Sequence, residues 1–209
     1  MNKMELASFI SQMKKQLSFL VLVTTLCLFS CNKTYSPKPK GYNRIDLPVA
    51  DYEWIKDEHP YTFQHNKASI VFDDTFNLFE PHWVHVYYPE FQANIQITYK
   101  NVLQDKKKFQ ELVDDAIKLA GRHQVKAYSI EESMIRTPSG KAACVIELVG
   151  DVPSHFQFYI TDTTKNFMRG ALYFPVANKN DSLAPVIEYV KKDVIQLLNT
   201  LQWREMKLK

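Results

Sequence analysis

The sequence predicts an α+β fold: a mainly antiparallel sheet of about six or seven strands with two major helices, the C-terminal one packed on the sheet. Short runs of β-branched and aromatic residues recur between residues 68 and 174, and turn residues separate most of them. Apolar residues at helical spacing lie within residues 109–120, and a longer stripe of this kind lies at residues 183–201.

The chain is expected to have three parts. Residues 1–30 are a signal peptide that is removed, residues 31–60 a Pro-rich, basic tether, and residues 61–209 a single globular α+β domain. Lys14 and Lys15 precede an apolar stretch that ends at Phe29, which is too short to span a bilayer because a span needs about 20 residues. A basic start followed by a short apolar stretch is typical of a signal peptide.

The end of this segment, Leu28-Phe29-Ser30-Cys31, resembles the bacterial lipoprotein signal. The small Ser30 fits a narrow cleavage pocket, so cleavage is expected between Ser30 and Cys31, and the Cys31 thiol is the expected lipid attachment site. Phe29 is bulkier than usual. A further acyl chain such as palmitate makes anchoring stable, since a single acyl chain binds a membrane only weakly. The alternative is an ordinary signal peptide with a chance cysteine.

The tether is predicted to be extended, because Pro37 and Pro39 restrict its backbone. Its basic residues either lie near anionic head groups or only keep a linker soluble, and both interpretations are open. Asn32 follows the cysteine, where an Asp would favour the inner membrane. The expected location is therefore the outer membrane facing the periplasm, with the periplasmic side of the inner membrane as the alternative.

The first strands of the domain are short apolar runs: residues 68–72, 83–88 and 94–99. The third alternates cleanly, with Ile95, Ile97 and Tyr99 on one face. It is expected to form a hairpin with the second across residues 89–92.

The first helix is predicted over residues 109–120, with Asp105 as its N-cap and Gly121 as its C-terminal stop. The lysines at residues 106–108 oppose the helix dipole. They form either a docking patch or a solvated face, and the solvated face is favoured.

Four further strands are predicted: residues 125–135, 141–149, 156–160 and 167–174. Residues 137–140 form a turn with Pro at its second position and Gly at its fourth. The polar loop at residues 162–166, together with Arg169, is either a contact surface or a plain hairpin tip, and the tip is favoured. The apolar stripe at residues 183–201 then predicts a long helix over one face of the sheet, with Pro185 in its first turn.

The composition excludes several classes of function. The net charge is +3, and removal of residues 1–30 takes away more basic than acidic residues, so there is no electrostatic reason to expect nucleic acid. Only 5 glycines argue against a Gly-rich nucleotide loop. The motifs of P-loop, dinucleotide-binding, serine-hydrolase and zinc-protease sites are absent from the sequence. We therefore assign no catalytic residue, cofactor, metal ligand or small-molecule substrate.

The reactive side chains favour structural interpretations. His82 and His85 are three apart, which on a strand directs them to opposite faces, so a metal site there is disfavoured. Cys144 lies in an apolar strand and is interpreted as a small core residue. The acidic pairs at residues 114–115 and 131–132 are interpreted as surface charges.

Five segments stand out, in order, behind the lipoprotein signal: residues 35–48, 87–90, 156–162, 169–174 and 180–189. Together they resemble the gliding motility lipoprotein GldD family of Bacteroidota over almost the whole chain after residue 31. The resemblance implies a membrane-anchored, non-enzymatic structural or assembly component of the gliding motility and type IX secretion machinery. It also implies other gliding-machinery lipoproteins and envelope proteins as partners, and only Cys31 is carried over as a functional residue.

A second class of function is weighed beside this one. A lipoprotein that binds a small ligand, or acts as a cell-envelope hydrolase, would need a sizeable pocket between the sheet and the helix at residues 183–201. The absence of a nucleophile and base pattern favours the structural component.

Overall fold

The computed structural model describes residues 9, 12–20, 45–56, 58–75, 80–175 and 180–205, with only the backbone described for residues 180–182. By its internal contacts the chain divides into two units, residues 1–41 and 42–209. In the first unit, residues 12–20 are helical and exposed. Among the described residues, no helix combines the length and the apolar character that a membrane span requires.

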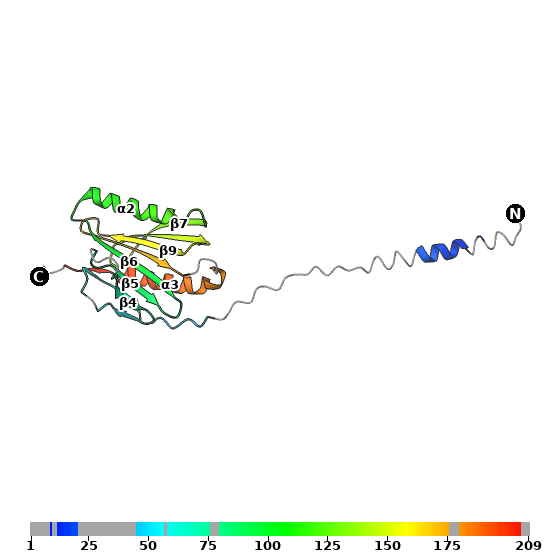
Figure 1. The fold of residues 1–209 in the computed structure, drawn as a ribbon, viewed down its shortest axis with the longest axis horizontal. Coiled ribbons are helices and arrows are strands. Elements are labelled where there is room, and N and C mark those ends of the chain that lie inside the picture. Colours follow the sequence, from blue (N-terminus) through cyan, green and yellow to red (C-terminus); the bar gives the residue numbers. More distant parts are fainter. Residues whose placement is uncertain are drawn as a thin grey trace. The chain divides into compact units, whose positions relative to one another are not determined.

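The second unit is built on a seven-stranded sheet in which every neighbouring pair is antiparallel. In sheet order its strands are β4 (Ile70–Asp73), β5 (Val84–Tyr88), β6 (Ala93–Asn101), β10 (Asn166–Tyr173), β9 (Ser154–Thr161), β8 (Ala142–Gly150) and β7 (Ala127–Arg136). The predicted α+β fold with a mainly antiparallel sheet is confirmed (Figure 1).

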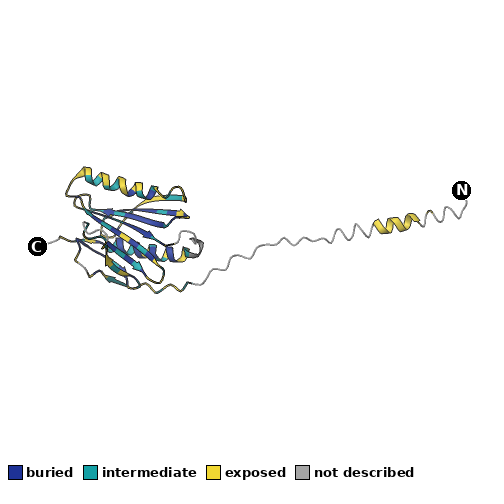
Figure 2. Ribbon diagram, viewed as in Figure 1, coloured by how far each residue is buried: buried dark blue, intermediate teal, exposed yellow. Residues whose placement is uncertain are grey.

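Helix α3 (Asn180–Thr200) covers one face of this sheet, as predicted. Alternation along the strands directs Ile95 and Leu172, which are cross-strand partners, to this face. Both are almost completely buried, and Val190 and Val194 of α3 pack in the same core. In Figure 2 the strands of the sheet carry much of the dark blue that marks buried residues.

Helix α2 (Lys106–Gly121) packs on the opposite face, over β9 and β10. Its Ala116 is buried against Phe167 and the half-buried Tyr159. The predicted N-cap is confirmed, because the Asp105 side chain accepts backbone N–H groups of Lys107 and Lys108 at 2.8 and 3.1 Å. Gly121 is the last helical residue.

Two small sheets were not predicted. β1 (Tyr52–Trp54) pairs with β3 (Gln64–Asn66), and β2 (Tyr61–Thr62) pairs with β11 (Gln202–Trp203). Ile55 is 5% exposed and its N–H donates to the carbonyl of Phe63 at 3.1 Å. The compact unit starts at Tyr42, ahead of residue 61, where the sequence predicts the start of the domain.

The long helix begins earlier than its apolar stripe. Because α3 starts at Asn180 rather than near residue 183, Pro185 lies beyond the first turn, inside the helix. Its missing N–H leaves one carbonyl of the amino-terminal end without an intrahelical partner. The helix ends at Thr200, within one residue of the end of the predicted stripe, and β11 follows.

Candidate functional site

The predicted lipid attachment site, Cys31, and the predicted cleavage site between Ser30 and Cys31 lie outside the described residues. Their chemistry remains a prediction from the sequence. The candidate sites within the described part of the chain are a surface groove, a smaller hollow and a buried carboxylate.

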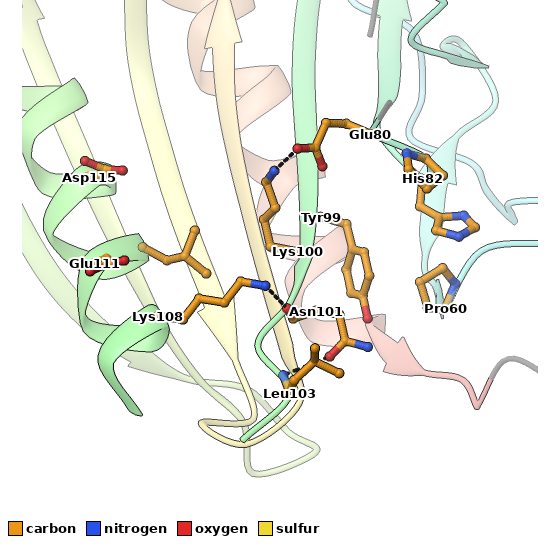
Figure 3. Close-up of a pocket in the computed structure, with 12 residues that line it drawn as sticks. Pro60, Glu80, His82, Tyr99, Lys100, Asn101, Leu103, Lys108, Glu111 and Asp115 are labelled. Atoms are coloured by element: carbon orange, nitrogen blue, oxygen red, sulfur yellow. Dashed lines mark hydrogen bonds and ion pairs between the residues drawn. The ribbon is translucent and has the colours of Figure 1, made fainter. Parts of the chain in front are cut away.

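The groove has a volume of about 590 Å³ and lies between the amino-terminal half of α2 and the end of β6 (Figure 3). Its lining carries more acidic than basic side chains: Glu80, Glu111 and Asp115 against Lys100 and Lys108. Glu111 and Asp115 come from α2 together with Lys108, whereas Lys100 of β6 pairs with Glu80. The excess negative charge therefore lies on the helix wall.

The two lysines of the groove are held by neighbours. Lys100 forms an ion pair with Glu80 and lies 5.3 Å from the ring centroid of Trp83. Lys108 extends from α2 to donate to the carbonyl of Asn101 at 2.7 Å, as Figure 3 shows. Each lysine thus connects two separate segments of the chain, and these contacts do not require a bound ligand.

At the rim of the groove, His82 meets a second histidine that sequence reasoning did not connect with it. The Nδ1 atoms of His59 and His82 lie 3.2 Å apart, and His59 Nε2 lies 3.5 Å from an oxygen of Asp73. Burial, followed by the neighbouring His59, lowers the pKa of His82. Which of the two rings donates across this contact depends on their tautomers.

His85 does not join this pair. His82 precedes β5 in a left-handed conformation with φ 72°, so the expectation that both histidines share one strand is wrong for His82. His85 lies on the strand, stacked on Phe72 at 5.1 Å. Within the described ranges, no group of three His, Cys, Asp or Glu side chains is arranged to hold a metal ion.

A smaller hollow of about 230 Å³ lies between α3 and strands β8 and β9. Lys191 donates there to Glu147 at 2.6 Å and to Glu188 at 3.0 Å. Partial burial opposes the Lys191 charge, but the two carboxylates outweigh it and raise the pKa of Lys191. This is the position where the alternative function required a pocket, and its volume is below the roughly 300 Å³ at which ligand pockets begin.

The buried carboxylate is Asp193 of α3, which is 4% exposed. It accepts hydrogen bonds from Tyr52 at 2.7 Å, Tyr88 at 2.9 Å and Asn66 at 3.0 Å. Burial raises the pKa of the Asp193 carboxyl, and the three donors act against that shift. Sequence reasoning missed this residue, although a signal existed: Asp193 lies on the apolar stripe of its helix, three residues after Val190.

Cys144 is completely buried, and its thiol donates to Glu132 at 3.3 Å. Burial, followed by this hydrogen bond to Glu132, raises the pKa of Cys144 to about 12. A thiol of this kind is protonated at neutral pH and is a poor nucleophile. The interpretation of Cys144 as a core residue agrees with these contacts.

The polar loop at residues 162–166 is a tight hairpin tip. One oxygen of Asp162 accepts the backbone N–H groups of Thr164, Lys165 and Asn166 at 3.0, 2.8 and 2.9 Å. Although burial opposes ionisation, these bonds lower the pKa of Asp162. The Arg169 guanidinium donates a hydrogen bond to the side-chain oxygen of Gln157 at 2.6 Å. The side chains are thus used to hold the turn together.

A comparison with protein families matches residues 32–203 to the family described as gliding motility lipoprotein GldD. No curated protein sequence matches the chain. The matched stretch covers the eleven strands and two helices that the structure describes in the second unit, and it begins directly after Cys31.

Proposed function

The chain belongs to the family of the gliding motility lipoprotein GldD, and from this premise we propose that it is a lipid-anchored, non-enzymatic assembly component of the gliding and type IX secretion machinery. One observation carries the proposal: the family match starts at residue 32, immediately after the cysteine of a lipoprotein signal. Other gliding-machinery lipoproteins and envelope proteins are its partners in this proposal.

The anchor is a covalent lipid at Cys31. Cleavage after Ser30 frees the amino group of Cys31, and its thiol carries the diacylglyceryl unit. Each buried methylene of an acyl chain contributes about 0.8 kcal/mol, so several chains hold the protein stably where one chain would not. Asn32 directs the protein to the outer membrane, with the domain in the periplasm.

The described side chains support a non-enzymatic role. The Cys144 thiol has a pKa of about 12, so it is not activated for attack. In the groove, Lys100 pairs with Glu80 and Lys108 donates to the backbone carbonyl of Asn101. Asp193 is used internally, since its partners come from β1, β3 and β5.

The test replaces the anchor and leaves the domain intact. Cys31→Ala should yield a folded protein that leaves the membrane fraction and supports neither gliding nor type IX secretion. Cys27→Ala is the matched control, because it removes a neighbouring cysteine of the signal and keeps the lipoprotein motif. Normal gliding and secretion by a soluble Cys31→Ala protein would contradict the proposal.

The volume of the groove favours one second candidate, the binding of a small ligand. About 590 Å³ lies within the range of ligand pockets, and the lining is mixed polar and apolar. Lys108→Ala would then abolish function in a folded, membrane-bound protein, while Lys106→Ala, in the same turn but outside the lining, would not. If Lys108→Ala and Lys100→Ala both retain function, the groove does not bind a ligand that the function requires.

A further inference from the structure

Strand β7 (Ala127–Arg136) forms one edge of the large sheet and is far longer than β4, which forms the other edge. It is ten residues long. Among the residues that the structure describes, no strand pairs with its outer side. A long edge strand presents unpaired backbone donors and acceptors, which another strand can bind.

The hairpin between β7 and β8 determines which residues present these groups. The N–H of Thr137 donates to the carbonyl of Lys141 at 2.9 Å, so the backbone groups of Thr137 point toward β8. In an antiparallel ladder, successive residues direct their backbone groups to alternate sides. Those of Ile130, Glu132, Met134 and Arg136 therefore point outward, in an unbroken register.

The side chains along this edge combine apolar and charged groups. Met134 is 64% exposed, and Tyr128 near the start of the strand is 80% exposed. Glu132 and Arg136 are also exposed. They lie two residues to either side of Met134 and on the same face of the sheet, because alternate residues of a strand share a face.

We propose that β7 binds β7 of a second copy of this chain, antiparallel, with Met134 of both copies on a two-fold axis. In this register Glu132 of each copy lies opposite Arg136 of the other, and Met134 lies opposite Met134. All three positions direct their backbone groups outward, so each facing pair exchanges two hydrogen bonds. The two sheets become one continuous sheet, and both apolar side chains leave water.

Charge selects this register and this partner. A strand with a negative group, an apolar group and a positive group at equal spacing is complementary to itself under two-fold symmetry. Pairing centred on Glu132 would oppose two like charges, which destabilises cross-strand pairs. Pairing centred on Ser133 would place Glu132 against Met134 and form no directly opposed ion pair.

The test uses a disulfide across the proposed axis in the full-length protein, in its own envelope. Facing residues of a hydrogen-bonded pair have Cα atoms about 5.5 Å apart, which a disulfide can bridge. Met134→Cys is made together with Cys144→Ala, because Cys144 is the cross-strand partner of Met134 within the same chain and would compete. Mild oxidation should give a covalent dimer, and a reducing agent should cleave its disulfide and return the monomer.

The matched control is Ser133→Cys in the same Cys144→Ala background. In the proposed register two Ser133 positions are diagonal, at about 7–8 Å, so their disulfide should form poorly. A stronger crosslink through residue 133 than through residue 134 would overturn the proposal. So would a monomer with both variants, or an adduct of residue 134 with a protein of different mass.

A charge exchange separates specific pairing from chance collision. Arg136→Glu should lower the yield of the Met134→Cys dimer about threefold or more. In the proposed register it places a glutamate opposite Glu132 at both symmetry-related positions, and like charges repel there. Adding Glu132→Arg restores opposite charges and should restore the yield. No rescue by the second substitution would count against the pairing of Glu132 with Arg136.

Discussion

Tyr52 donates a 2.7 Å hydrogen bond to Asp193, which lies 141 residues further along the chain. Tyr88 and Asn66 donate to the second oxygen of the same carboxylate. One buried group of α3 thus connects the small sheet of β1 and β3 with strand β5 of the large sheet. The amino-terminal strands are held to the domain by this network in addition to their apolar contacts.

Replacement of Asp193 by Ala should lower the free energy of unfolding by about 3 kcal/mol, because three buried donors lose their acceptor. Urea denaturation measures this loss. Lys192→Ala is the control on the next, exposed position of the same helix, and it should change stability by less than about 0.5 kcal/mol. Equal losses for both variants would refute a specific role of the carboxylate.

The stability should depend on pH through the same residue. Burial raises the pKa of Asp193, so the folded protein retains this proton to a higher pH than the unfolded chain does. The contribution of this group to stability therefore falls as pH rises between the ordinary and the raised pKa. Relative to Asp193→Asn, the wild type should gain stability when the pH is lowered from 7 toward about 4. Urea denaturation across that range checks the sign, and a relative loss on acidification would contradict it.

Gly170→Ala should destabilise the sheet. A Cβ atom at Gly170 would lie 2.3 Å from two ring atoms of Phe158, its neighbour on β9. Overpacking of this kind costs about 1–3 kcal/mol, which thermal denaturation would detect. Gly121→Ala is the contrast, since nothing lies within 4 Å of its added Cβ. A stability of Gly170→Ala equal to that of the wild type would show that the ring moves aside freely.

Cys144 should resist alkylation in the folded protein. Its thiol is buried and has a pKa of about 12, so very little thiolate is present at pH 8. Labelling by a maleimide, followed by mass spectrometry, should be more than about 100-fold slower in native protein than in urea. Rapid native labelling at Cys144 would mean that β8 opens readily.

Much of this fold follows from periodicity. The alternation of Ile95 and Ile97 predicts a strand, and the stripe that contains Val190 and Val194 predicts the long helix, because each pattern buries one face. Strands β1, β2, β3 and β11 have only two or three residues, too few for a pattern to stand out. Their pairing depends on contacts far apart in sequence, which local pattern cannot show.

The candidate sites were harder to predict from the sequence, because their residues also lie far apart along the chain. His59 and His82 are 23 residues apart, and only the turn before β5 brings their rings together. Asp193 was detectable as a charged residue on an apolar helical face, but its partners Tyr52 and Tyr88 were not. Cys31 is the reverse case, because the prediction of lipid attachment there depends only on adjacent residues and needs no fold.

The pairing of β2 with β11 sets the order in which the domain can be completed. Tyr61 is synthesised long before Trp203, yet these two residues are cross-strand partners. The N–H of Arg204 also donates to the carbonyl of Pro60 at 2.8 Å. A nascent chain therefore cannot pair β2 with β11 until Trp203 has been made, so this pairing follows the synthesis of all the strands that lie between them. A chain truncated before residue 202 should keep the seven-stranded sheet but lack the partner of β2. Protease should then cleave the segment around β2 faster than in the full-length protein.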